Sequence, residues 1–160
     1  MFREMRRFKQ AASVAECLAV LKGAKRAVLS VHGEDGYPYG VPVNFYYHAD
    51  DGKIYIHSAV TGHKVDALKA DSRVCLTTWS GDSLDEDGWS YHTVSVVVFG
   101  RADEVTDDAV RRDILRRLGE KYFPEGSDQE IASDIHRNLS RTLLLAITPD
   151  HMTGKRVHEK

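Results

Sequence analysis

The stretch "YGVPVNFYYHADDGKIYIHSAVTGHKVDAL", residues 39–68, decides the fold. Residues 39–48 alternate in the way a half-buried strand does. The turn residues Asp50-Asp51-Gly52 predict a hairpin into a second strand over residues 53–57. Pro42 lies inside the first strand, and proline has no N–H to donate to a neighbour. The sequence therefore requires an edge, a bulge or a ligand at Pro42.

The rest of the chain adds antiparallel strands and several helices. Further strands are predicted over residues 26–32, 73–79, 91–105 and 141–148, with Pro149 ending the regular pairing of the last one. Helices are predicted from the capping boxes at Ser13 and Ser127, from a cap at Thr106 or Asp107, and over residues 62–70. Residues 81–88 form an acidic loop. Six antiparallel strands with late helices predict a mainly β, α+β domain over residues 1–160, either a small barrel or an open sheet.

Composition and charge narrow the classes of function. A net charge of −2 gives no basic face for nucleic acid, and no apolar run approaches the roughly 20 residues of a membrane span. The first ten residues are basic but have no apolar segment behind them, so they do not resemble a signal peptide. Cys17 and Cys75 have no CxxC partner, which favours reduced thiols. We expect a cytoplasmic protein that binds neither nucleic acid nor membrane.

The segment "HSAVTGHK", residues 57–64, joins a strand to a helix and is a candidate anion site. A helix start presents unpaired amide groups and the positive end of the helix dipole. Thr61-Gly62-His63-Lys64 adds a hydroxyl, an imidazole and an ammonium, which suits a phosphate. The alternative is that Thr61 merely caps the helix, with His63 and Lys64 in solvent.

Other chemistry finds less support in the sequence. His57 lies near His63 in the sequence, and His48 could approach His92, but no tight ligand pair or HExxH helix is present. Neither cysteine has a polar setting, and there is no GxSxG elbow. We therefore expect no metal site and assign no catalytic residue.

Several segments resemble the flavin-binding split-barrel proteins related to pyridoxamine 5′-phosphate oxidase, and most of all their nitroimidazole-resistance branch. The resemblance covers "GEDGYPYGVPVNFYYHADDGKIYIHSAVTGHKVDAL", "RVCLTTW", "VSVVVFGRADEV" and "AITPDHMTGKRV", which is nearly the whole chain. It implies a six-stranded antiparallel split β-barrel with peripheral helices, and a homodimer with FMN at its interface.

The resemblance also implies roles for individual residues. The phosphate would lie at His63 and Lys64, beside Ser58 and Gly62. The flavin ring would contact Pro42, Val43 and Asn44, and the ribityl chain would lie near His57, Ser58 and Ala59. Ser95 matches a family position that reaches the cofactor. Two departures are visible: His63 stands where an arginine is more common, and the C-terminal "AITPDHMTGKRVHEK" lacks the arginine and histidine pattern with which the oxidase grips pyridoxal phosphate.

The resulting prediction is an FMN-dependent oxidoreductase that reduces a small planar substrate, such as a nitroimidazole or a related nitro compound. Any NAD(P)H would bind transiently, because the chain has no dinucleotide fingerprint. A pyridoxamine 5′-phosphate oxidase-like enzyme, a non-enzymatic flavin or haem binder and a structural dimer with an empty site remain alternatives. Apolar strand surface at Tyr39, Phe45 and Tyr47 independently favours a dimer.

Overall fold

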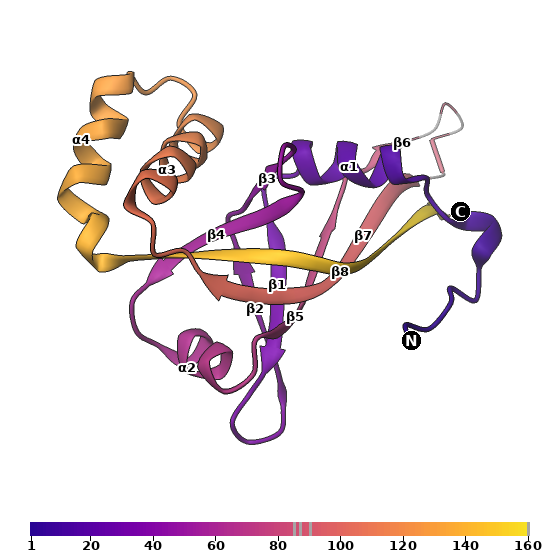
Figure 1. Ribbon diagram of the computed structural model, residues 1–160. Coiled ribbons are helices and arrows are strands. Elements are labelled where there is room, and N and C mark those ends of the chain that lie inside the picture. The colour runs from indigo at the N-terminus through magenta and orange to yellow at the C-terminus, as the bar shows by residue number, and fades with distance from the viewer. Residues whose placement is uncertain (85, 87, 90, 160) are drawn as a thin grey trace.

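The computed structural model describes residues 1–84, 86, 88–89 and 91–159 (Figure 1). Its helices are η1 (Phe8–Gln10), α1 (Val14–Gly23), α2 (His63–Ala70), α3 (Asp108–Tyr122), α4 (Asp128–Asn138) and η2 (Leu139–Arg141). Its strands are β1 (Ala27–His32), β2 (Pro38–Val43), β3 (Tyr46–His48), β4 (Lys53–Ala59), β5 (Arg73–Trp79), β6 (Ser83–Leu84), β7 (Tyr91–Glu104) and β8 (Thr142–Glu159). This antiparallel sheet with peripheral helices confirms the predicted α+β class.

The strand order explains how the sheet closes. The strands run β2-β1-β5-β7-β8-β4-β3, with β6 on β7. β2 and β3 therefore lie at opposite ends of the order, yet only Asn44 and Phe45 separate them in the chain. The two edges must meet at this corner, so the sheet curls into a barrel that is split between β2 and β3. Pro42 lies on the edge strand β2, which satisfies the requirement that its missing N–H imposes.

Three predicted boundaries were wrong. The single strand expected over residues 39–48 is two strands, because the chain crosses from one edge of the sheet to the other at Asn44 and Phe45. The loop expected over residues 81–88 contains the two-residue strand β6, while Asp85 and Asp87 of that loop lie outside the described residues. Together these changes turn the predicted six strands into eight among the described residues.

The third error concerns Pro149, which does not end the last strand. β8 continues to pair with β7 beyond Pro149, as far as Glu159, and a register shift between Phe99 and Gly100 absorbs the irregularity. Gly100 lies opposite Pro149 and Phe99 opposite His151, so Asp150 is the extra residue of a bulge. Gly100 lets the β7 backbone approach β8 closely at this bulge, since a Cβ there would lie 2.5 Å from the Thr148 carbonyl oxygen.

The helix starts follow the capping signals. Ser13 and Ser127 both form complete capping boxes, and Asp107 rather than Thr106 accepts hydrogen bonds from the first amides of α3. α3 and α4 form a hairpin at one end of the barrel (Figure 1). The hairpin is tight, because a Cβ at Gly119 would lie 2.7 Å from Ile131. No described helix is long and apolar enough to span a membrane.

Two apolar clusters hold the fold together. The larger fills the barrel, and Leu29, Phe45, Ile56, Leu76 and Val98 are among its fully buried members. The smaller joins α3 to the outer face of β4 and β8 through Tyr55, Ile114, Leu118, Leu144 and Ala146. α3 thus packs on the outside of the barrel, where it positions the helical hairpin next to the end of β4.

The end of α3 also fixes the corner between β2 and β3. The Phe45 N–H donates to the Tyr122 hydroxyl at 2.9 Å, and the Lys121 ammonium donates to the Phe45 carbonyl oxygen at 2.9 Å. Lys121 Nζ also lies 4.2 Å from the centre of the Phe45 ring. Burial, with a smaller contribution from the charge of Lys25, lowers the pKa of Lys121 to about 8. The corner is therefore held by buried polar contacts as well as by the core.

An ion pair ties α1 to the far end of β8 and predicts a pH effect on stability. Arg156 bonds Glu16 through Nε at 2.7 Å and Nη2 at 2.8 Å, and the pKa of Glu16 falls from 4.5 to about 2, chiefly because of this bond. The carboxylate form is thus favoured by folding, and its contribution is present above pH 4.5 and lost as the pH falls toward 2. We expect Glu16→Gln to lower the thermal unfolding midpoint at pH 7, with the difference from wild type shrinking below pH 4.5.

A matched control keeps the interpretation specific. Glu34 lies in the turn between β1 and β2 and forms no ion pair among the described residues, so Glu34→Gln should leave the midpoint nearly unchanged. A difference between wild type and Glu16→Gln that stays constant from pH 7 to pH 2 would show that the ion pair does not contribute through its charge.

Candidate functional site

The start of α2 has the free amide groups that the sequence predicts, but a different cap. Gly62 is the N-cap, with φ 128° and ψ 167°, and no side chain caps the helix, so the alternative in which Thr61 caps α2 is wrong. Glycine is the residue that tolerates this backbone conformation. The amides of Val65 and Asp66 bond the Gly62 carbonyl oxygen, whereas those of His63 and Lys64 lie in the first turn, where amides lack intrahelical partners.

Lys64 is a half-buried cation without a counter-ion. It forms no ion pair among the residues that the structure describes, and burial lowers its pKa. The Lys64 charge also acts on His57 at the end of β4. The pKa of His57 is lowered chiefly by desolvation of the charged imidazole and, to a smaller extent, by repulsion from Lys64. The start of α2 is therefore a region of positive potential that an anion would stabilise.

His63 connects this region to the edge strand. Its ring stacks on Tyr39 of β2, with the ring centres 4.2 Å apart and an angle of 25° between the planes. The imidazole is exposed and lies beside β2, while Lys64 lies on the side of His57. His63 and Lys64 are thus neighbours in the first turn that contact different parts of the barrel.

The other predicted residues occupy three places. Pro42 points outward from β2, whereas Val43 is buried in the core, which leaves only its backbone available to a ligand. Asn44 lies at the corner between β2 and β3. Ser58 is half-buried on the inward side of β4, and Ala59 ends that strand in an exposed position. These residues and the start of α2 surround one end of the barrel.

Ser95 is not brought to this end within one subunit. It pairs with Lys155, while His57 pairs with Leu144, so the two positions are eleven residues apart along β8. Ser95 could join the other residues only across an interface between two subunits. Its assignment to the cofactor site remains a prediction.

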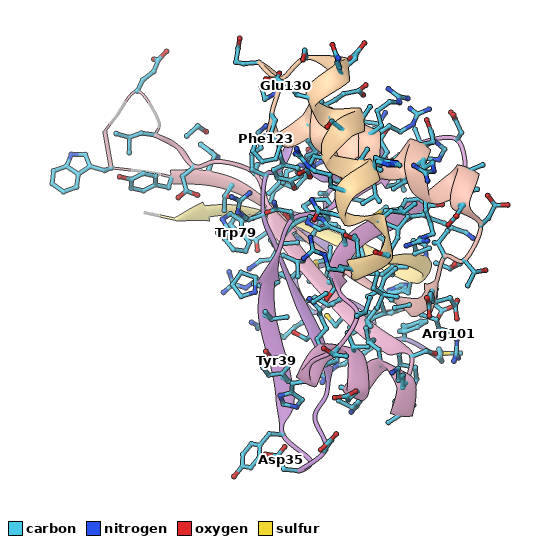
Figure 2. The ribbon with its side chains drawn as sticks, turned by 90° about the vertical axis from the view of Figure 1, so that its left-hand side faces the viewer. Asp35, Tyr39, Trp79, Arg101, Phe123 and Glu130 are labelled. Atoms are coloured by element: carbon cyan, nitrogen blue, oxygen red, sulfur yellow. The ribbon has the colours of Figure 1, made fainter. Side chains whose placement is uncertain are left out.

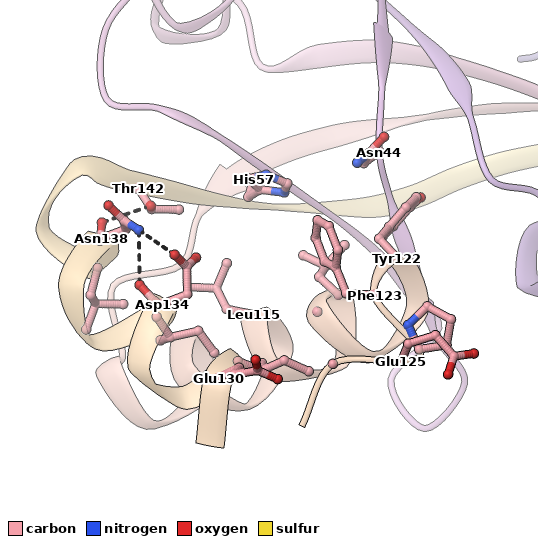
Figure 3. A pocket seen from close by; sticks show the side chains of 17 residues that line it. Asn44, His57, Leu115, Tyr122, Phe123, Glu125, Glu130, Asp134, Asn138 and Thr142 are labelled. Carbon is pink, nitrogen blue, oxygen red and sulfur yellow. Dashed lines mark hydrogen bonds between the residues drawn. The ribbon is translucent and has the colours of Figure 1, made fainter. Parts of the chain in front are cut away.

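A cavity of about 790 Å³ lies beside His57 and Asn44, between the barrel and the α3–α4 hairpin (Figure 3). Its apolar wall is made of Leu115, Leu118, Phe123, Ile131, Ile135 and Leu139. Polar groups come from both sides, because Asn44 and His57 belong to the barrel and Tyr122, Asn138 and Thr142 to the hairpin and its connection to β8. The cavity contains two of the predicted site residues.

The hairpin side of this cavity was not predicted from the sequence. The available signal was the stripe Ile131, Ile135 and Leu139 on α4, which is typical of a helix packed on a core. In the structure Ile131 and Leu139 are buried, but Ile135 is only half-buried and faces the cavity. An apolar stripe left partly uncovered is the mark of the cavity, but it becomes visible only when the neighbouring helix has been placed.

The proximity of Lys64 and His57 predicts a measurable change in titration. Lys64→Ala removes the like charge but leaves the desolvation of the His57 imidazole unchanged. The His57 pKa should therefore rise while staying below 6.5. NMR titration of the His57 ring protons in wild type and Lys64→Ala would test this. Lys69→Ala, at the other end of α2, is the control and should not change the His57 pKa. An unchanged value in Lys64→Ala would contradict the arrangement described here.

Comparison with known proteins agrees with the geometry. The family model described as pyridoxamine 5'-phosphate oxidase matches residues 13–156. A comparison with curated proteins finds no match. A candidate 5-nitroimidazole antibiotic resistance protein from Bacteroides thetaiotaomicron has a similar structure, with 23% identity, a TM-score of 0.75, and coverage of 93% of this chain and 87% of that one.

Two further structures share the fold. A FAD-binding protein from Mesorhizobium loti is 23% identical, with a TM-score of 0.65 and coverage of 92% of this chain and 96% of that one. A FAD and haem binding protein from Mycobacterium smegmatis is 21% identical, with a TM-score of 0.68 and coverage of 91% and 72%. The family match over residues 13–156, together with a barrel split between β2 and β3, shows that the chain belongs to the pyridoxamine 5'-phosphate oxidase family of flavin-binding split barrels.

Proposed function

We propose that the protein binds FMN between two copies of the chain and uses it to reduce a small planar substrate, such as a nitroimidazole or a related nitro compound. The observation that supports this most directly is the Lys64 ammonium. It is half-buried, lacks an ion pair among the described residues and lies in the first turn of α2. A phosphate there would offset the desolvation of the ammonium and accept hydrogen bonds from the free amides.

The residues around this point fit the remaining parts of the cofactor. The Asn44 side chain can donate and accept hydrogen bonds at the edge of a flavin ring. Lys121 and Tyr122 hold the neighbouring Phe45 backbone, and so they orient Asn44. The α3–α4 hairpin forms one wall of the cavity beside Asn44 and His57. A bound flavin would supply hydride transfer, for which these residues provide orientation and electrostatics.

The outward face of the sheet supports the dimer, for a reason that differs from the sequence argument. Phe45 is completely buried within one subunit, and Tyr39 and Tyr47 pack against the core, so these residues leave little surface to cover. A row without a charged side chain instead crosses five strands on the outside of the sheet: Pro42, Val28, Thr77, Val97 and Thr153. A two-fold dimer is the commonest way to cover such a face.

This uncharged row is continuous with two of the predicted cofactor contacts. Pro42 belongs to the row itself, and Ser95 lies two residues from Val97 with the same side-chain direction. A second subunit on this face would bring Ser95 to the site from a different chain. Phe99 and its partner His151 belong to the next row of outward-facing residues, and Phe2 stacks on both of them.

Two other functions are weaker. Pyridoxamine 5'-phosphate carries a phosphate, but the described residues that line the cavity include no lysine or arginine to bind a second one. A non-enzymatic flavin or haem binder agrees with the fold of the FAD and haem binding protein from Mycobacterium smegmatis. Enzyme and passive binder differ in turnover, which the following experiment measures.

The proposed function is tested on purified protein reconstituted with flavin. We expect a bound-flavin absorption spectrum, tighter binding of FMN than of FAD, bleaching by NAD(P)H and reoxidation by metronidazole under anaerobic conditions. Binding without turnover with any nitro compound would make the protein a flavin carrier. A spectrum that shows only free flavin would end the proposal.

The dimer has a separate test. Light scattering should give a mass about twice that of one chain. Val97→Arg places a charge in the middle of the uncharged row and should yield monomers with weakened FMN binding, because burying an unpaired charge is costly. Ser133→Arg, on the exposed side of α4, is the control and should remain dimeric. A monomeric wild type that still binds FMN tightly would remove the interfacial site from the proposal.

A further inference from the structure

We propose that the cavity under the α3–α4 hairpin is the substrate site and that it selects planar organic cations over anions of the same shape. This inference rests on the proposed function, because the site would lie next to the flavin. It adds the charge of the substrate, which neither the fold nor the family match specifies.

The size and composition of the cavity suit a small aromatic molecule. Its volume of about 790 Å³ lies within the roughly 300–1,000 Å³ of small-molecule sites. Leu115 and Ile135 are half-buried and Phe123 is exposed (Figure 2), and together they offer an apolar wall to a ligand. Asn44 and His57 stand on the opposite side, where they face the hairpin (Figure 3). A planar ring would thus have apolar contacts on one side and hydrogen-bonding groups on the other.

The charges around the cavity have one sign. Glu125, Glu130 and Asp134 contribute three carboxyl groups to its lining, and the described lining residues include no lysine or arginine. The backbone and hydroxyl of Ser127 lower the pKa of Glu130, so that this group is ionised at neutral pH. His57 is the remaining basic group in the lining. Desolvation lowers its pKa, which favours the neutral imidazole. The cavity is therefore negative at pH 7.

Neighbouring cations reduce this negative charge only in part. Arg137 lies 3.4 Å from one Asp134 oxygen, and that oxygen also accepts from Asn138 at 3.0 Å. Glu125 has no ion pair among the described residues. Glu130 has none either, so two of the three carboxylates have no cation within 4 Å in the described chain. A cationic ligand would provide that partner.

The two ends of the site have opposite electrostatic character, and His57 lies between them. On one side Lys64 and the start of α2 favour an anion; on the other the hairpin favours a cation. An anionic cofactor and a cationic substrate would each be directed to its own end. Substrates that carry carboxylate or phosphate would be repelled from the hairpin, consistent with the absence of lysine and arginine among its described lining residues.

The test uses three redox-inactive probes of nearly identical shape: benzamidine, benzamide and benzoate. Their binding to the apo-protein is measured by calorimetry and by NMR shifts of His57, at low ionic strength and pH 7.5. Because single exposed ion pairs are weak, we expect benzamidine to bind about tenfold more tightly than benzoate, with benzamide between them. Added salt should reduce the ratio.

Variants separate charge from shape. Glu125→Gln combined with Asp134→Asn removes two of the three lining carboxylates and should reduce the preference for benzamidine over benzoate without closing the cavity. Ile135→Trp should fill the cavity and weaken all three probes, whereas Val110→Trp adds the same ring at an exposed position of α3 outside the cavity and should have no effect.

Each outcome is decisive, and failure of this inference is distinguishable from failure of the proposed function. Equal affinities for the three probes in wild type would overturn the selection of cations. No binding of any probe by protein that still binds FMN would remove the substrate site and leave the flavin proposal intact. Binding of benzamidine by protein that does not bind FMN would keep the cation site and end the proposed function.

Discussion

Phe45→Ala is expected to lower the free energy of unfolding by about 3–5 kcal/mol, the range for a large aromatic side chain removed from a core. Phe45 is completely buried and occupies the two-residue corner where the edges of the barrel meet. Its ring also contacts the Lys121 ammonium. The substitution therefore leaves a cavity and uncovers a partly desolvated cation. Urea unfolding followed by circular dichroism measures the change.

Phe8→Ala is the matched control, because Phe8 is 72% exposed. Its removal should change the free energy of unfolding by less than about 0.5 kcal/mol. A loss below about 1 kcal/mol for Phe45→Ala would show that the barrel can collapse around the missing ring, since the cost of such substitutions depends on how well the site relaxes. The Phe45 ring would then contribute less to the stability of the corner than its burial implies.

Lys64→Ala is expected to weaken FMN binding by about ten- to a hundredfold, which corresponds to the loss of a charge-assisted hydrogen bond of about 1.5–3 kcal/mol. Riboflavin lacks the phosphate and should bind wild type and variant almost equally. Lys69→Ala changes a lysine in the last turn of the same helix and should affect neither ligand. Titration of the apo-proteins, followed by flavin fluorescence, measures all six affinities.

The comparison between the two flavins makes this prediction specific. Equal losses for FMN and riboflavin in Lys64→Ala would mean that the lysine supports the fold instead of the phosphate. No loss for either would leave Lys64 as a half-buried residue without a ligand. His63→Ala should weaken FMN binding in the same direction.

The sequence predicted local features well, because local chemistry determines them. Both capping boxes formed as expected, since serine and glutamate three positions apart satisfy each other's amides. Pro42 required an edge, a bulge or a ligand, and β2 is an edge strand. His57 and Lys64 lie near each other, because only the three residues 60–62 separate the end of β4 from the start of α2.

Features that depend on distant segments were not predictable in the same way. Pro149 ends pairing in an ordinary strand, but here the bulge opposite Gly100 absorbs it, and that register is set by residues almost fifty positions earlier. The division of residues 39–48 into two strands depends on the closing of the whole barrel. The cavity under the hairpin needs α3, α4 and β4 together, so no single segment carries its signal.

The place of β8 in the sheet has a consequence for synthesis and folding. β8 is the neighbour of both β7 and β4, so Ile54 of β4 meets its partner Ile147 only after more than ninety further residues have been made. Until then β4 has β3 alone beside it, and its other edge is open to pairing with another chain. Contacts so distant in sequence also slow folding. A chain truncated before Thr142 would keep two unpaired strand edges, so it should aggregate instead of forming a smaller barrel.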